Sequence, residues 1–279
     1  MNAFLGTAWY DNQPDGLIYI GKIAFKYKGT MPDNTSIAIK DGTNIIAGGA
    51  FDGCDGLTSV TIPNSVTKIG VEAFYNCRRL TSITIPNSVT EIEDYVFAEC
   101  ASLTSVTIGN SVTTIGDEAF YYCNEISKIT IPKTVKTIGS NAFACNDESE
   151  VYVEWDDPSD RTLSFAQQPF SDKIMQYGTL YVPTGTKSLY EQTEPWKNFV
   201  NIVEYDPAGV EEIEAEGGVT IGVEGGKIVV NGAGDAKVKV FGTNGAAVYS
   251  GSADNLPELA AGIYIVRVGS TVKKVAVAQ

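Results

Sequence analysis

The sequence contains no histidine among its 279 residues. This absence excludes the serine–histidine and cysteine–histidine arrangements of nucleophilic catalysis, and every metal site that requires an imidazole ligand. No window approaches the roughly 18 consecutive apolar residues that a membrane-spanning helix requires, so no membrane span is predicted. No glycine-rich segment leads into Gly-Lys-Ser or Gly-Lys-Thr, so a phosphate-binding P-loop is not predicted either.

Basic residues are also scarce. Lys and Arg total 20 against 34 Asp and Glu, which gives a net charge of −14. Such a chain repels phosphate backbones and anionic lipid surfaces, so nucleic acid and membranes are not expected partners. With 43% apolar and 19% charged residues, the composition is that of a globular protein. No cofactor or metal ion is predicted.

What the chain does contain is a repeat. Residues 57–74 read LTSVTIPNSVTKIGVEAF, and residues 80–97 read LTSITIPNSVTEIEDYVF. The same 23-residue step relates Phe51, Phe74, Phe97, Phe120 and Phe143, and also Leu57, Leu80, Leu103 and Ile126. A fixed period of this length indicates a solenoid, because one coil buries its apolar face only against its neighbours. A diverged coil around Ile37 and Ile39 begins the array.

Each repeat divides into short segments. Residues 57–62 are followed by Pro-Asn-Ser, which predicts a strand ended by a turn, and residues 66–69 begin a second extended piece. Residues 116–120 read Gly-Asp-Glu-Ala-Phe, whose acidic residues suit the positive end of a helical turn. Ile115, Ala119 and Cys123 fall four apart and are expected on one face of that turn.

The pattern L-x-x-V-x-I-P-x-x-V-x-x-I-x-x-x-A-F-x-x-C resembles the BspA-like leucine-rich repeats of bacterial surface proteins. The resemblance covers roughly residues 28–150 and is almost letter for letter in the coils that begin at Leu57, Leu80, Leu103 and Ile126. It implies a right-handed, β-rich (α+β) solenoid with parallel strands on its concave side. Some members of this class bind matrix proteins, so the resemblance favours an interaction role, and the expected partner is a host extracellular-matrix protein or a mucin glycan. Because the usual catalytic arrangements are absent from the sequence, no enzymatic activity is predicted.

Four cysteines follow the period: Cys54, Cys77, Cys100 and Cys123. Equivalent residues in adjacent coils lie about 5 Å apart, so the spacing permits disulfides. A position repeated in every coil also fits a small apolar side chain facing the core, and this interpretation is favoured. A zinc site is disfavoured because a linear row does not converge tetrahedrally. Cys145 lies out of phase and indicates where the regular array ends.

The two ends of the array require caps. Residues 16–29 alternate apolar and polar residues around a Gly-Lys pair, which predicts a hairpin within an N-terminal cap and first diverged repeat over residues 1–50. Regular repeats follow at 51–150, and degenerate repeats with a C-terminal cap at 151–206. This last segment contains the aromatic residues Trp155, Phe165, Phe170, Trp196 and Phe199. They are expected to fill the end of the core, and the alternative is a ligand platform.

Residues 207–218, PAGVEEIEAEGG, are predicted to form a linker. Short strands separated by glycine turns follow in 219–279 and predict a small antiparallel, immunoglobulin-like β-sandwich. In this segment VKVFGTNGAAVYSG and LAAGIYIVRVGSTVKKVAVAQ resemble the sorting domain of the type IX secretion system of Bacteroidetes, and Gly262 and Tyr264 are part of the match. The resemblance implies that the secretion machinery recognises this domain and that the solenoid is its cargo.

The first residues, MNAFLGTAWYDNQ, have neither a basic residue nor a long apolar core, so they are not interpreted as a signal peptide. Either the protein is intracellular, or this is a mature region behind an added Met1. The resemblance at the C-terminus favours the second interpretation and implies a secreted or outer-surface location, as in the Bacteroides proteins whose N-terminal part residues 16–34 resemble.

Two groups of polar residues are candidates for a site. Residues 154–160, EWDDPSD, are an acidic cluster near aromatic residues, but they lack the spacing of an EF-hand, and a solvated loop is favoured over calcium or glycoside chemistry. The second group comprises residues expected to face outward from the strands: Ser59, Thr61, Ser82, Thr84, Ser105, Thr107, Lys128 and Thr130. Such rows can contact an extended peptide or a glycan, although hydroxyls are also common at any exposed strand position.

Three functions fit these patterns. An exported, adhesin-like solenoid that binds host proteins or glycans is favoured, because solenoids offer extended surfaces without a cleft. A polysaccharide-acting enzyme or subunit with carboxylates near 154–160 requires a pocket with two carboxylates about 5–10 Å apart. A purely structural surface component would self-associate and bind no host ligand.

Overall fold

The computed structural model describes residues 4–160, 162–163, 168–205, 220–224, 227–234, 237–242, 247–257, 259, 262–268 and 271–277. The chain forms two compact units, Met1–Tyr205 and Asp206–Gln279, and each is described by itself. The linker predicted at 207–218 lies outside the described residues.

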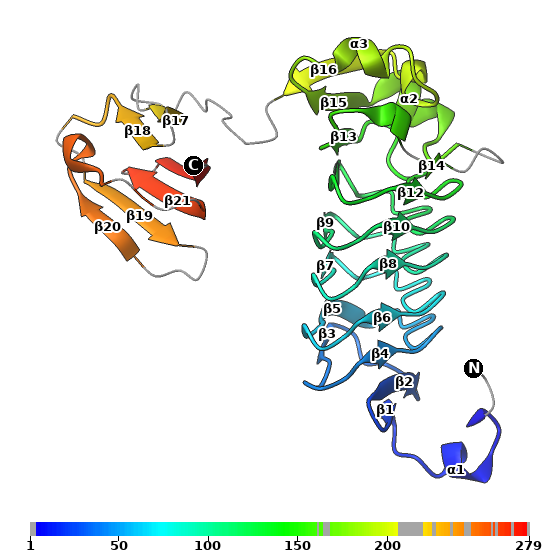
Figure 1. The fold of residues 1–279 in the computed structure, drawn as a ribbon. Helices are drawn as coiled ribbons and strands as arrows, with labels where there is room; N and C mark the ends of the chain where they lie inside the picture. Colours follow the sequence, from blue (N-terminus) through cyan, green and yellow to red (C-terminus); the bar gives the residue numbers. More distant parts are fainter. Residues whose placement is uncertain are drawn as a thin grey trace. The chain divides into compact units, whose positions relative to one another are not determined.

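The short strands of the first unit form one eight-stranded sheet, in the order β1-β2-β4-β6-β8-β10-β12-β14. Their bounds are Gly16–Ile20 (β1), Ile23–Lys28 (β2), Ile45–Ile46 (β4), Lys68–Ile69 (β6), Glu91–Ile92 (β8), Thr114–Ile115 (β10), Thr137–Ile138 (β12) and Thr162–Leu163 (β14). Strands β1 and β2 form an antiparallel hairpin, and the later neighbours are parallel and one coil apart, as in the pairing of Ile69 with Ile92. Figure 1 shows these strands stacked in chain order within the unit.

A second side of each coil carries the other strands, which form two four-stranded parallel sheets, β3-β5-β7-β9 and β11-β13-β15-β16. Their bounds are Thr35–Ala38 (β3), Leu57–Thr61 (β5), Ser82–Thr84 (β7), Ser105–Thr107 (β9), Lys128–Ile131 (β11), Glu150–Val153 (β13), Thr179–Pro183 (β15) and Asn201–Tyr205 (β16). Buried residues such as Val60 and Ile83 alternate with outward-facing polar residues along these strands. The predicted solenoid with parallel strands is therefore confirmed.

The third side of each coil consists of consecutive tight turns, so the helical turn expected at residues 116–120 is wrong. Glu118 has a φ of 53°, in the left-handed region, which ends any right-handed helix. The amides here bond between coils instead: Glu118 N donates to Ser140 O and Phe120 N to Ala142 O, both at 2.8 Å. Ala119 and Cys123 are nevertheless both buried, as the spacing predicted.

One of these turn positions offers a stabilising substitution. Glu72 is exposed and has a φ of 58°, whereas the equivalent residue one coil earlier is Gly49. A non-glycine residue in this conformation destabilises the folded chain by about 1–2 kcal/mol. Replacement by glycine recovers only part of this, because glycine also increases the conformational entropy of the unfolded chain. We expect Glu72→Gly to raise the free energy of unfolding by about 0.5–1 kcal/mol in chemical denaturation. The matched change Glu91→Gly, in strand β8, is expected to lower it, and equal effects of the two changes would contradict the argument.

The core of the first unit contains a continuous column of phenylalanine rings. Neighbouring rings have centroids 5.0–5.7 Å apart and interplanar angles of 4–14°. The column comprises Phe51, Phe74, Phe97, Phe120, Phe143 and Phe170. All six side chains are almost completely buried, beside the equally buried row that begins at Leu57. One coil alone would expose this surface, so each coil depends on its neighbours for stability.

All five cysteines are buried and free, which agrees with a small side chain facing the core, and the structural role of the cysteine row stays a prediction. Three of them donate to a phenylalanine carbonyl of the preceding coil: Cys77 to Phe51 O, Cys100 to Phe74 O and Cys123 to Phe97 O, at 3.1–3.2 Å. The thiol thus fills a small apolar space and also supplies a weak donor to a buried carbonyl. This pairing gives a physical reason for cysteine at the position.

Burial raises the pKa of Cys54 to about 12 and that of Cys145 to about 11, from an ordinary value of 9.0. Because the folded chain holds these protons more tightly than the unfolded chain, the corresponding stability is fully present below pH 9 and is lost as pH rises toward 11–12. At pH 8 we expect iodoacetamide to leave the native thiols unmodified and to label all five after unfolding, as read by mass spectrometry. Rapid labelling of native Cys100 would contradict this expectation.

The C-terminal end of the solenoid is closed by aromatic residues. Trp155, Phe170, Trp196 and Phe199 are all buried, and Trp155 and Trp196 pack edge to face at 5.3 Å. The interpretation that they fill the end of the core is supported, and a solvent-facing platform of these four rings is wrong. Phe165 lies outside the described residues. Around them lie helices α2 (Asp172–Tyr177) and α3 (Lys187–Tyr190), and the 3-10 helix η3 (Trp196–Asn198).

The second unit consists of antiparallel strands that pack on a core of their own. Strands β17 (Thr220–Glu224) and β18 (Lys227–Asn231) form one pair, and the order β20-β19-β21-β22 forms a four-stranded sheet. The bounds of the latter are Val238–Gly242 (β19), Ala247–Gly251 (β20), Gly262–Val268 (β21) and Thr271–Val277 (β22). Ile221 and Ile228 share one hydrophobic core with Val238, Val240 and Val266. Two antiparallel sheets are present, as predicted, and their closure into an immunoglobulin-like sandwich stays a prediction.

Candidate functional site

The outward-facing residues of the longer strands form rows along the solenoid. Ser59 pairs with Ser82 and Ser82 with Ser105, while Thr84 pairs with Thr107. Thr61, Ser82, Thr84, Ser105, Thr107 and Lys128 are exposed, and Ser59 and Thr130 are half-buried. The row also extends one coil earlier, where Ser36 Oγ lies 2.6 Å from Ser59 Oγ. We call these residues the hydroxyl rows.

Three tyrosines lie on the strands that follow β11 in its sheet, and the sequence patterns did not identify them. Tyr152 and Tyr181 stack with centroids 4.2 Å apart and an interplanar angle of 3°, and Tyr205 packs against Tyr152 at 90° and 5.1 Å. These residues come from β13, β15 and β16 and are half-buried. We call Tyr152, Tyr181 and Tyr205 the tyrosine cluster. A signal was available, because tyrosine alternates with buried residues in VYVEW and TLYVP.

Polar contacts hold the tyrosine cluster in place. The Lys128 ammonium lies 4.0 Å from the centroid of the Tyr152 ring. Glu150 accepts hydrogen bonds from the hydroxyls of Tyr152 (3.3 Å) and Tyr181 (3.2 Å). Burial and the Glu150 carboxylate raise the pKa of Tyr152, so this phenol stays neutral and can donate. The structure thus places Lys128 of the predicted rows beside a fixed aromatic surface.

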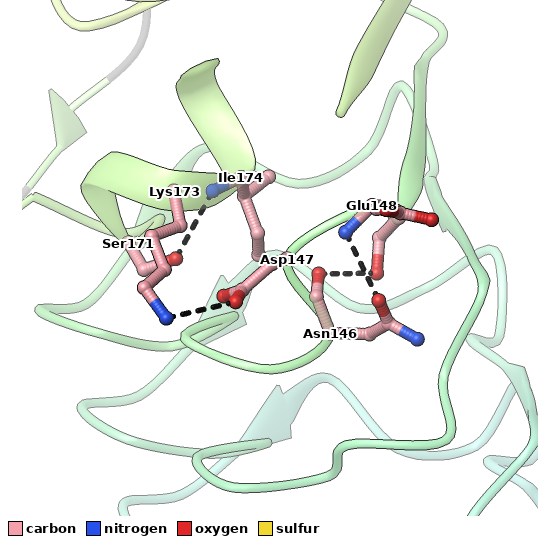
Figure 2. Close-up of polar contacts among 7 residues, drawn as sticks. Asn146, Asp147, Glu148, Ser171, Lys173 and Ile174 are labelled. Carbon is pink, nitrogen blue, oxygen red and sulfur yellow. Dashed lines mark hydrogen bonds and ion pairs between the residues drawn. The ribbon is translucent and has the colours of Figure 1, made fainter. Parts of the chain in front are cut away.

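A polar groove of about 740 Å³ lies at the end of the regular array. Its lining includes Tyr121, Tyr122, Asn124, Asn141 and Lys173, together with the loop 146–148. Figure 2 shows the contacts of that loop and of the start of α2: Asp147 pairs with Lys173 at 3.0 Å, and the Asn146 side chain accepts from Glu148 N at 2.9 Å. The out-of-phase Cys145 precedes this loop, which was the signal in the sequence for the break.

The acidic cluster at 154–160 does not form a pocket with its aromatic neighbour, because Trp155 is buried and donates to Pro132 O at 3.2 Å. Glu154 accepts from Lys133 N at 3.3 Å, and Asp157 accepts from both the amide and the hydroxyl of Ser159. Across the described ranges, no group of three or more His, Cys, Asp or Glu residues is arranged to hold a metal ion. In the same part of the chain, no helix is long and apolar enough to span a membrane.

The regular coils follow a 23-residue step, and each buries a leucine or isoleucine, a phenylalanine and a cysteine. Residues 18–149 match the BspA type leucine-rich repeat region, in six copies. The matched residues include strand β2 and the coils from Phe51 to Phe143. They end at residue 149, at the loop that lines the polar groove.

Solved structures of leucine-rich repeat proteins are similar to this chain. A T. pallidum leucine-rich repeat protein is 25% identical, with a TM-score of 0.45, over 61% of this chain and 86% of that one. A Bacteroides ovatus leucine-rich repeat protein is 24% identical (TM-score 0.46), over 61% and 42% of the two chains. A leucine-rich cell surface protein from Faecalibacterium prausnitzii is 34% identical (TM-score 0.43), over 48% and 35%. No curated protein sequence matches the chain significantly.

Proposed function

We propose that this protein is an exported cell-surface solenoid that binds an extended, basic segment of a host extracellular-matrix protein along its hydroxyl rows. The observation that carries the proposal is that Lys128, at the end of the hydroxyl rows, lies against the Tyr152 ring of the tyrosine cluster, 4.0 Å from its centroid. Hydroxyl groups both donate and accept hydrogen bonds, so they complement the polar groups of an extended peptide backbone. The match to BspA-type repeats supports an interaction function over a catalytic one.

The tyrosine cluster supplies what the rows lack, which is apolar contact area. Tyrosine loses little conformational entropy on binding and is enriched among the residues that dominate interface energies. Here the rings are already held by Glu150 and by stacking, so a partner meets a preformed surface. The net charge of −14 favours a basic partner segment through long-range attraction.

The test uses the full chain and a panel of immobilised matrix proteins and mucins, read by surface plasmon resonance. We expect saturable binding to at least one matrix protein, weakened at least tenfold in Thr84→Lys/Thr107→Lys, which places two cations on the exposed rows. The matched control is Thr67→Lys/Thr90→Lys, two exposed threonines beside the β6 and β8 strands of the eight-stranded sheet, which should bind like the wild type. Equal weakening in both variants, or self-association as the only binding, would contradict the proposal.

The cell-surface location rests on the resemblance of residues 219–279 to a secretion sorting domain. A chain that lacks this segment is expected to stay inside the native cell, while the full chain becomes accessible to protease added to intact cells. Surface display of the truncated chain would show that the segment is not the export signal, and would leave the binding proposal to the test above.

A further inference from the structure

The polar groove at the end of the array shares no residue with the hydroxyl rows. We propose that it binds a neutral oligosaccharide. Its volume of about 740 Å³ falls within the range of roughly 300–1,000 Å³ that small-ligand sites occupy. One wall is Tyr121, Tyr122 and Asn124 on the turns of one coil, and the other is the loop 146–148 with the start of α2.

The groove combines an aromatic ring with amide groups. Tyr122 is 52% exposed and is held edge to face against Tyr121, at 4.3 Å and 82°. The apolar C–H face of a pyranose ring packs against such a ring. Asn124, Asn141 and the loop residue Asn146 also line the groove. Each amide carries both donor and acceptor atoms, which suits the vicinal hydroxyls of a sugar.

Residue 122 distinguishes this coil from the preceding ones. Its φ is 57°, and the equivalent residues Glu99, Asn76 and Gly53 also have positive φ angles, so this turn conformation belongs to the repeat. Among these four coils, only this one carries an aromatic side chain at the position, and the ring is exposed and lines the groove.

The charges of the groove select among sugars. Asp147 and Lys173 form an ion pair at 3.0 Å, which leaves Glu148 as an exposed carboxylate beside the groove. The chain as a whole has a net charge of −14. Both features repel sialylated and sulfated glycans. A hydrogen bond also stabilises the start of α2 beside the groove: Ser171 Oγ accepts from Ile174 N at 3.2 Å (Figure 2).

The test is a printed array of neutral, sialylated and sulfated oligosaccharides, probed with the full chain and followed by calorimetry on the strongest neutral hit. Two substitutions restore the residues of earlier coils and so preserve the fold: Tyr122→Asn, as at Asn76, and Asn124→Ala, as at Ala101. We expect binding to neutral glycans, with affinity lowered at least tenfold in each variant and a thermal unfolding midpoint no lower than that of the wild type.

Thr84→Lys/Thr107→Lys serves as the control that separates this site from the proposed function, because it alters the hydroxyl rows alone. It should bind the neutral glycan as the wild type does, whether or not a matrix protein is found. The inference is overturned if no neutral glycan binds, if anionic glycans bind better, or if both groove variants bind like the wild type.

Discussion

Replacing Phe97 with alanine is expected to lower the free energy of unfolding by about 3–5 kcal/mol. Phe97 lies in the middle of the phenylalanine column, stacked on Phe74 at 5.3 Å and on Phe120 at 5.4 Å, with no exposed surface. Removing the ring leaves a cavity that the neighbouring coils cannot close, because their spacing is fixed by backbone hydrogen bonds such as Phe97 N to Ala119 O. Urea unfolding of the full chain, followed by tryptophan fluorescence, measures the change.

The matched control is Val71→Ala. Val71 is 42% exposed and lies on the turns of a neighbouring coil, so its truncation should change the free energy of unfolding by no more than about 0.5 kcal/mol. A Phe97→Ala effect as small as that of the control would mean that the column does not couple the coils. All three tryptophans of the sequence can contribute to the signal, and two of them, Trp155 and Trp196, lie at the end of the first unit.

Replacing Tyr181 with alanine is expected to weaken binding of the matrix-protein partner about 30-fold or more, which corresponds to roughly 2 kcal/mol at an interface hot spot. The substitution removes the ring that stacks on Tyr152 and one of the two tyrosine hydroxyls that donate hydrogen bonds to Glu150. The partner then loses contact area, and the remaining tyrosine rings are no longer held in place. We expect the weaker binding to result mainly from faster dissociation. The measurement is surface plasmon resonance with the full chain.

Tyr177→Ala is the control for this prediction. Tyr177 is 61% exposed at the end of α2 and lies outside the tyrosine cluster, so its loss should leave binding unchanged. If Tyr181→Ala binds as tightly as the control, the tyrosine cluster is not the anchor, and the partner contacts the rows elsewhere.

The regular part of the solenoid follows from the sequence because a single physical requirement repeats there. Each coil must bury the same apolar positions against the next, so a 23-residue step places Phe74 on Phe97 and Ile83 beside Val106. The turns were harder to predict. Acidic residues near Glu118 suggest a helix start, but hydrogen bonds between coils hold this residue at a φ of 53°.

The tyrosine cluster could not be assembled from the period, because the period changes where the cluster begins. Ile129 pairs with Val151, an offset of 22 residues, and Val151 pairs with Leu180, an offset of 29. An alignment at 23 residues therefore never brings Tyr152 and Tyr181 together. The groove could not be predicted from the period for the same reason, because its loop 146–148 belongs to the segment in which the regular repeat ends.

If the proposed function is correct, the strands that carry the hydroxyl rows and the tyrosine cluster contact the partner. Hydroxyl-radical footprinting of the full chain, alone and saturated with the bound matrix protein, can show this contact, because tyrosine oxidation is read residue by residue. We expect oxidation of Tyr152, Tyr181 and Tyr205 to fall at least threefold in the complex, while Tyr177 is oxidised as before. Protection of Tyr177 with no protection of the tyrosine cluster would contradict it.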